Sequence, residues 1–300
     1  MPNITKDIKF QYAILVYEDS NGVQKRFDFE KWLHAMNQVP YEGRAKKVYT
    51  NLVRLDKCQE KDERDGLIGL RFLRLRDSNM PYKVPNQEEA QDLDIADDEF
   101  IGESLHIVYD TETRYFMIQV NRYSVGLNGL AAYINLTNTD SEKTVHFKPF
   151  HKNLDISKLS FGRYKCLEIG VANVGVIPNT LMNSSLGSIL NAAQDYGGQT
   201  IKIKISIGRA RKQTLKRPPV ENLIRELPGL TDVITSARLI YCEGDMEKGE
   251  ELNLLDLVEK SVLSLQILER KALDFDYTIK TMKQEYINKK AVLDRMLNMV

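Results

Sequence analysis

The side chains best placed to do chemistry lie in residues 196–220, a run of 25 residues without a carboxylate in a chain of zero net charge. Clustered Lys and Arg heads neutralise backbone phosphates, so this basic segment is expected to bind nucleic acid, either DNA or RNA. The alternatives are an acidic protein surface, or a solvated loop that keeps an exposed sheet edge from pairing with other chains. Its seven cations are Lys202, Lys204, Arg209, Arg211, Lys212, Lys216 and Arg217.

The basic segment is predicted to begin as a strand. Isoleucines alternate with polar residues over Ile201–Ile207, so one face should be buried, while Lys202 and Lys204 share the wet face roughly 7 Å apart. A cationic loop follows and ends at Pro218-Pro219. Tyr196 is the only aromatic residue of the segment, so readout by base stacking is not expected from it.

A second basic element ends another predicted strand, in the sequence Leu70-Arg-Phe-Leu-Arg-Leu-Arg-Asp. Arg74 and Arg76 can project together there and grip a phosphate in bidentate fashion, so they are secondary candidates for nucleic-acid contact. The alternative is pairing with the acidic segment, residues 84–113, which contains no Lys or Arg. Its ten acids are Glu88, Glu89, Asp92, Asp94, Asp97, Asp98, Glu99, Glu103, Asp110 and Glu112.

Patterns for catalysis or metal binding are sparse. Asp155, Glu168 and a strand lysine could form a nuclease-like set, but Ile169-Gly170 interrupts the Glu-x-Lys spacing of the common nuclease core. The acidic segment lacks the Asp-x-Asp-x-Asp-Gly pattern of a calcium loop, and no glycine-rich nucleotide motif is present, so no cofactor is expected. No metal site or disulfide framework is expected from the scattered histidines and cysteines, which are His34, His106, His146, His151, Cys58, Cys166 and Cys242.

The elements that must position these residues are short strands and helices. Gln11–Tyr17 and Val23–Phe27 predict a hairpin around Asn21-Gly22, and Asp28 should cap a helix that ends before Pro40. Other strands are expected at 47–55, 66–75, 105–109, 114–120, 144–150, 166–171, 201–207, 234–242 and 262–268. Helices are expected at 124–136, 179–196, 220–227 and over the last thirty residues, with a solvated loop at 79–98.

This mixture predicts an α+β fold with mixed, mainly antiparallel sheets, flanking helices and a long C-terminal helix. Three hundred residues suffice for two modest domains. We expect an N-terminal α+β domain at 1–152, with an acidic loop near 84–103. A C-terminal α+β domain at 163–300 would hold the basic strand and loop and the terminal helix. A single intertwined domain is the alternative.

The C-terminal helix has apolar residues at alternating spacings of three and four, interrupted by Lys289. Packing of the helix on its own domain is expected by default. A contact between two copies in a homodimer is the alternative, through Phe275, Ile279, Met282, Tyr286, Leu293 and Met296.

A membrane partner is not expected. No apolar run approaches 18 residues, and the N-terminus lacks the basic start and apolar core of a secretion signal. These features predict a cytoplasmic protein.

Two motifs resemble those of a family of uncharacterised bacterial proteins of similar length, whose genes often lie in prophages or defence islands. The first is Asp65-Gly-Leu-Ile-Gly-Leu-Arg-Phe-Leu-Arg-Leu-Arg-Asp-Ser-Asn-Met-Pro, and the second is Asp97-Asp-Glu-Phe-Ile-Gly-Glu followed by Tyr109-Asp110. The resemblance implies a role against phage, or at nucleic acid during conflict between genetic elements. It assigns no catalytic residue.

These observations favour a non-enzymatic, nucleic-acid-binding component of a bacterial defence or mobile-element system. The alternative is an interaction module that oligomerises or binds an acidic protein surface. A metal-dependent nuclease is the second alternative.

Overall fold

The computed structural model describes residues 3–19, 23–140, 143–150, 162–172, 186–208, 213–226, 234–243 and 249–297. The chain forms two compact units. Unit 1 comprises Met1–His146 and Lys260–Lys290, and unit 2 comprises Phe147–Glu259 and Ala291–Val300. This division differs from the expected domains at 1–152 and 163–300, because residues 260–290 return to unit 1.

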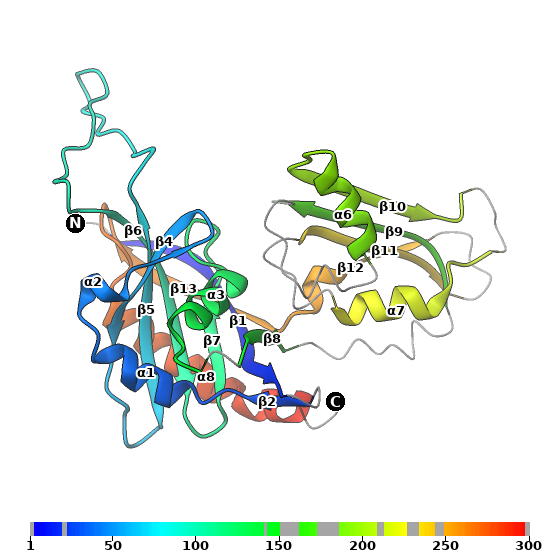
Figure 1. Cartoon of the computed structure of the whole chain (residues 1–300), viewed down its shortest axis with the longest axis horizontal. Helices are drawn as coiled ribbons and strands as arrows, with labels where there is room; N and C mark the ends of the chain where they lie inside the picture. The colour runs from blue at the N-terminus through cyan, green and yellow to red at the C-terminus, as the bar shows by residue number, and fades with distance from the viewer. Residues whose placement is uncertain are drawn as a thin grey trace. The chain divides into compact units, whose positions relative to one another are not determined.

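Unit 1 is built on an antiparallel sheet with the strand order β13-β1-β7-β6-β5-β4-β3, and β2 pairs with the end of β1 (Figure 1). The register places Phe10 of the first strand opposite both Ser261 and Gln119. The strands are β1 (Asn3–Glu18), β2 (Gln24–Arg26), β3 (Lys46–Val48), β4 (Asn51–Cys58), β5 (Leu67–Arg76), β6 (Ile101–Asp110), β7 (Tyr115–Gln119) and β13 (Lys260–Leu268).

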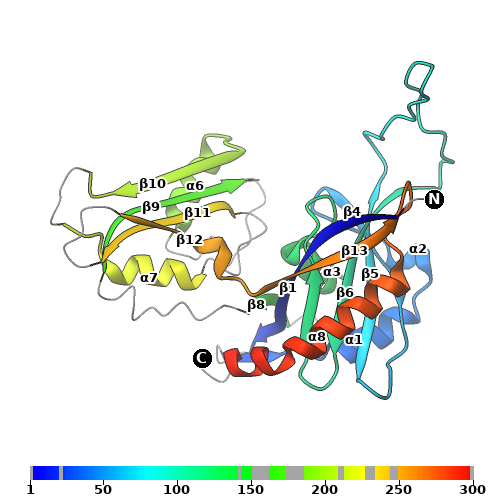
Figure 2. The same ribbon diagram turned by 180° about the vertical axis from the view of Figure 1, so that it is seen from behind.

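Helices cover both faces of this sheet, so unit 1 has three layers (Figures 1 and 2). On one face the ring of Phe29 lies 4.9 Å from the rings of both Tyr109 and Phe116. On the other face the hydroxyl of Tyr286 bonds to Asp110. The first face carries α1 (Phe29–Asn37), α2 (Tyr41–Arg44) and α3 (Leu127–Thr137), and the second carries α8 (Phe275–Leu297).

Helix α1 forms as the sequence predicts. The side chain of Asp28 accepts a hydrogen bond of 3.1 Å from the backbone amide of Lys31, which satisfies one of the free amides of the first turn. Trp32, Leu33 and Met36 are buried at helical spacing, and the helix ends before Pro40. The predicted cap, apolar face and end are confirmed.

Unit 2 contains a four-stranded antiparallel sheet with the order β10-β9-β11-β12. Within the described residues of unit 2, α6 and α7 lie on one face of this sheet (Figures 1 and 2), and their core includes Leu190, Leu223 and Ile224 against Leu167 and Ile169. The elements of unit 2 are β9 (Gly162–Ala172), α6 (Gly187–Asp195), β10 (Thr200–Ser206), α7 (Arg217–Glu226), β11 (Ile234–Glu243), β12 (Glu250–Asn253) and the 3-10 helix η3 (Leu254–Leu257). The strand before them in the chain, β8 (Val145–Pro149), pairs with β1 and belongs to the unit 1 sheet.

The predicted α+β class with mainly antiparallel sheets and a C-terminal helix is confirmed. One local prediction is wrong: residues 47–55 form not one strand but the hairpin β3–β4, because the chain turns at Tyr49 with a φ of 53°. The loop at 79–98 contains one isolated bridge, Lys83–Gln91, and is otherwise irregular and largely exposed. No helix in the described ranges is long and apolar enough to cross a bilayer.

Candidate nucleic-acid interface

The charged face of the unit 2 sheet lies opposite the face that α6 and α7 cover. On β10 the predicted alternation holds through its centre, where Ile203 is 8% exposed and the side chains of Lys202 and Lys204 are 70% and 60% exposed. The apolar face weakens towards the strand end, since Ile205 is 41% exposed. The two lysines therefore project together from a strand that the core anchors mainly through Ile203.

Glu168 of β9 lies directly opposite Lys204 in the antiparallel register. Its carboxylate is 2.6 Å from the Nζ of Lys204 and 3.8 Å from the Nζ of Lys202, so both lysines share one negative charge. The hydrogen bond from Lys204 lowers the pKa of Glu168, and the same bond raises the pKa of Lys204. At neutral pH this trio carries a net positive charge.

Arg238 extends the charged row on the next strand. The register places Arg238 of β11 opposite Glu168, and its guanidinium Nη1 lies 3.3 Å from the Oε1 of Glu251. Lys202 and Lys204 thus lie on β10 and Arg238 on β11, with Glu168 on the strand between them, and Glu251 of β12 lies beside Arg238. Exposed pairs of this kind are loosely held, because water screens them and long side chains lose entropy when they are fixed.

The remaining cations of the basic segment differ in position. Arg217 begins α7, where its Nη2 donates a 2.9 Å hydrogen bond to the carbonyl of Gly162 and its guanidinium lies over the ring of Tyr164. Lys216 is exposed just before the helix. Arg209, Arg211 and Lys212 lie outside the described residues.

Arg74 and Arg76, the secondary candidates, belong to β5 of unit 1 rather than to the unit 2 sheet. Arg74 donates a 3.1 Å hydrogen bond to the carbonyl of Tyr123. Arg76 lies 4.0 Å from a carboxylate oxygen of Glu103, so it pairs with a member of the acidic segment. β5 continues to Arg76, so Arg74 and Arg76 are two residues apart in one strand and lie on the same face.

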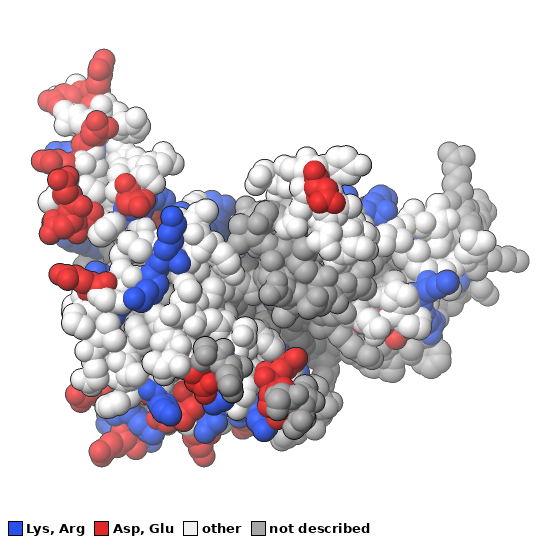
Figure 3. Space-filling view, in the orientation of Figure 1, with Lys and Arg blue, Asp and Glu red and all other residues white. Residues whose placement is uncertain are grey.

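The acids between β5 and β6 lie on an arm, residues 77–100, that stands away from the unit 1 sheet (Figures 1 and 3). The arm also exposes apolar side chains: Tyr82 is 66% exposed and Val84 is 69% exposed. Figure 3 shows its carboxylates gathered on the surface of the molecule. The acidic segment continues into β6, where Asp110 is fully buried.

The apolar seam of α8 is buried within the chain. Phe275, Ile279, Met282, Tyr286 and Leu293 are each at most 4% exposed, and Met296 is half-buried. Ile279 lies so close to β5 that a Cβ added at Gly69 would be 2.4 Å from its Cγ2. Packing within the chain accounts for the five buried residues, which do not present an exposed surface to a second copy.

The described ranges hold no candidate metal cluster. No three His, Cys, Asp or Glu side chains gather there in a geometry that could hold a metal ion. Cys58, Cys166 and Cys242 are free thiols. Asp155, the other acid of the nuclease-like set, and His151 lie outside the described residues.

Sequence reasoning missed the part that Glu168 plays as the anion between two lysines. Glu168 is the one acid in the strand predicted at 166–171, but a single sequence shows neither that this strand lies beside 201–207 nor the register of the pair. It also missed the buried cluster around Asp110. That cluster joins segments about 180 residues apart, for which the local pattern holds no signal.

One family model matches residues 3–292, nearly the whole chain, and it is described as a family of unknown function (DUF6731). No curated protein matches the chain.

Proposed function

Because the chain belongs to the DUF6731 family, whose function is unknown, its role must be argued from its own residues. We propose that it is a non-enzymatic component of a bacterial defence or mobile-element system that binds nucleic acid. The contact surface is the charged face of the unit 2 sheet, together with the cations that follow β10 in the sequence. The bacterial and defence setting comes from the motif resemblance alone.

The observation that carries this proposal is the placement of Lys202 and Lys204 on one exposed face, with Arg238 two strands away. Cations spaced along and across strands suit the repeated phosphates of a nucleic-acid backbone, which need charge but little specific geometry. Glu168 competes with phosphate for the two lysines but does not prevent the contact. Its single charge orients two lysine heads, and a bound phosphate can take its place beside either one.

The same face argues for binding without base readout. The exposed charged side chains are aliphatic cations, and the described part of the basic segment holds one aromatic residue, Tyr196, which lies outside the strands. Single-strand binders use aromatic platforms on which bases stack. The proposal is therefore contact with phosphates and weak dependence on sequence.

The test is a salt titration of binding to labelled duplex DNA, single-stranded DNA and RNA. The expected result is a log–log salt slope that falls by about 1 to 2 when Lys202 and Lys204 are both replaced by alanine, since each lost phosphate contact removes roughly 0.7 to 0.9 from the slope. The matched control replaces Lys271 and Lys280, two exposed lysines of unit 1, and should leave the slope unchanged. An affinity that does not change with salt concentration would overturn the proposal. So would a double variant with the same affinity and salt slope as the wild type.

The second candidate function is a protein-interaction module, favoured by the arm at residues 77–100. Eight exposed acids lie on this arm together with exposed apolar side chains, including Tyr82 and Val84. Acidic surfaces with apolar anchors bind basic protein surfaces through steering by charge and burial of the anchors. Pull-down of a partner that is lost on Tyr82→Ser with Val84→Ser, with nucleic-acid binding unchanged, would favour this function.

A further inference from the structure

The unit 1 sheet has an edge that differs from its other edges in charge. β13 is the last strand in the order of the sheet, and its outer side has no partner strand among the described residues. Its residues 261–268, Ser-Val-Leu-Ser-Leu-Gln-Ile-Leu, hold no charge and no proline. Val262 and Leu268 are 55% and 51% exposed on this strand.

The other unpaired edges carry charged residues. β3, at the opposite end of the sheet, has only three residues, and two of them are Lys46 and Lys47. The first part of β1 extends beyond β7 and carries Lys6, Asp7 and Lys9. Short length and lysines are the usual means by which proteins prevent edge strands from pairing with other chains. β13 has neither.

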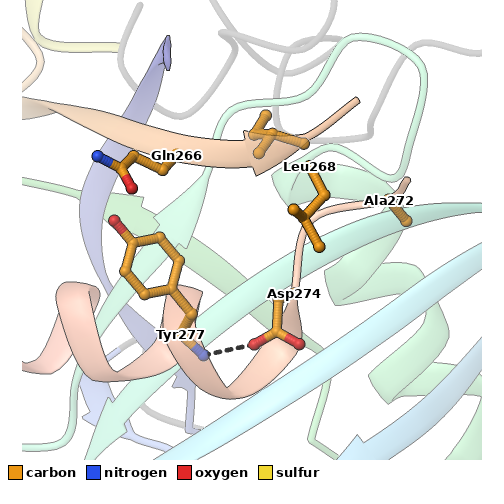
Figure 4. A pocket seen from close by; sticks show the side chains of 6 residues that line it. Gln266, Leu268, Ala272, Asp274 and Tyr277 are labelled. Atoms are coloured by element: carbon orange, nitrogen blue, oxygen red, sulfur yellow. Dashed lines mark hydrogen bonds between the residues drawn. The ribbon is translucent and has the colours of Figure 1, made fainter. Parts of the chain in front are cut away.

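A hollow lies beside this edge, between the end of β13 and the start of α8 (Figure 4). It has a volume of about 260 Å³, and Leu268, Ala272 and Tyr277 supply apolar surface to it. Tyr277 reaches from the helix toward Gln266 of the strand, while the backbone amide of Tyr277 bonds to the Asp274 cap at 2.8 Å. A strand added along β13 would pass this hollow and could place a side chain in it.

We propose that β13 pairs with β13 of a second copy, in antiparallel fashion about a two-fold axis, so that the two unit 1 sheets become continuous. Backbone hydrogen bonds along the edge would hold the pair, and Val262 and Leu268 of both copies would gain apolar neighbours. The partner is a second copy of this chain, because antiparallel pairing of β13 with β13 covers the uncharged edge of both copies. The result is a closed dimer with no β13 edge left open. If β13 paired instead with a charged edge of the second copy, the β13 edge of that copy would stay open. Further copies could then add to it, and the assembly would not close.

The test is the mass of the full chain by light scattering over a range of concentrations. The expected result is twice the 34.5 kDa of the chain, unaffected by raising salt. Val262→Lys should weaken the dimer at least roughly tenfold, since it places a charge on the shared edge of both copies. The matched control is Val23→Lys, because Val23 is 54% exposed but lies before β2. This variant should remain a dimer.

Two further measurements keep the outcomes distinct. Circular dichroism checks that Val262→Lys is folded, and Leu268→Lys replaces it if it is not. Hydrogen exchange at residues 261–268 should slow as the concentration rises, because the added strand protects the outer amides. A monomer at concentrations on the order of 100 µM overturns the proposal. A dimer that remains intact in both lysine variants also overturns the proposal. A dimer that dissociates when salt is raised does so too, because it would be held by charge.

Discussion

The hydroxyl of Tyr286 donates a 2.7 Å hydrogen bond to the carboxylate of Asp110, and Asp110 is fully buried. The Nζ of Lys290 lies 2.9 Å from the same carboxylate. The bonds connect α8 to the turn after β6, where Asp110 also accepts from the amides of Glu112 and Thr113. A charge at the centre of unit 1 is thus held by four donors, and the helix cannot leave the sheet without exposing it.

Asp110→Asn should destabilise unit 1 by about 2 kcal/mol, because the amide cannot accept the same set of bonds and leaves a buried donor without a partner. Burial alone would raise the pKa of Asp110, but bonds from Lys290, Tyr286 and the two amides hold it below its usual value. The lowered pKa means that this stabilisation is present above the unfolded-state value near 4 and is lost as the pH falls through the folded value. Urea unfolding of the two proteins at pH 7 and pH 3 measures both effects. Equal stability of variant and wild type at pH 7 would contradict this account.

The stability of unit 1 should fall between pH 7.5 and pH 5.5 because of His106. Burial lowers the pKa of this histidine, although its hydrogen bond to Gln119 opposes the shift. Because the folded pKa is lowered, the unfolded state binds a proton more readily as the pH falls through 6.5, and this costs at most about 1.4 kcal/mol at pH 5.5. His106→Gln should remove most of the change with pH, whereas His34→Gln, at an exposed position, should not. The urea midpoints of the wild type and the two variants at pH 7.5 and pH 5.5 test this prediction. An equal change with pH in all three proteins would contradict the role of His106.

Gly69→Ala should destabilise the chain by about 1 to 3 kcal/mol, through overpacking against α8. The new Cβ would lie 2.4 Å from the Cγ2 of Ile279 and 2.7 Å from the Oε1 of Gln59. Adding Ile279→Ala should cost less in this background than alone, because it opens the space that the methyl needs. Gly102→Ala is the control, since its Cβ would meet the nearest atom, the Cδ1 of Leu73, at 3.3 Å. Thermal unfolding of the wild type, the two single variants and the double variant measures these free-energy changes. Strictly additive changes would show that residue 69 and Ile279 do not interact.

Glu168→Gln should tighten binding to nucleic acid by about two- to fivefold at low salt, because it releases Lys202 and Lys204 from a carboxylate that competes with phosphate. Fluorescence anisotropy with a labelled duplex measures the change. Glu63→Gln removes an exposed acid of unit 1 and serves as the control for net charge. Weaker binding by Glu168→Gln than by this control would mean that the lysines do not contact phosphate.

Much of the fold could be predicted because its local signals are strong. Asp28 caps α1, and the residues at 105–109 and 114–120 form a hairpin as their strand pattern indicates. The turn at Tyr49 could not be foreseen, because a left-handed φ is usually marked by Gly, Asn or Asp, and a tyrosine gives no such signal. Strand β1 was predicted to start at Gln11 rather than Asn3, because residues 3–9 are polar and become a strand only by pairing with β13.

The candidate site was predictable in composition but not in arrangement. The alternation of Ile203 with Lys202 and Lys204 identified the exposed cations of β10 correctly as a shared face. Their pairing with Glu168 depends on the register of β9 and β10, and Arg238 enters the row from a strand over thirty residues further along. Contacts of this kind follow from tertiary pairing, which a single sequence does not encode in any local pattern.

Unit 2 is inserted between β1 and β13, and this order has a consequence for synthesis of the protein. β1 leaves the ribosome first, but Phe10 meets its partner Ser261 only after the whole insertion has been made. Residues 147–259, the larger part of unit 2, are complete before that point and can fold as the chain emerges, which shortens the effective loop that β1 must close. During that interval the nascent β1 lacks its neighbour on one side. The growing chain therefore depends on an early-folding insertion to bring the two ends of unit 1 together.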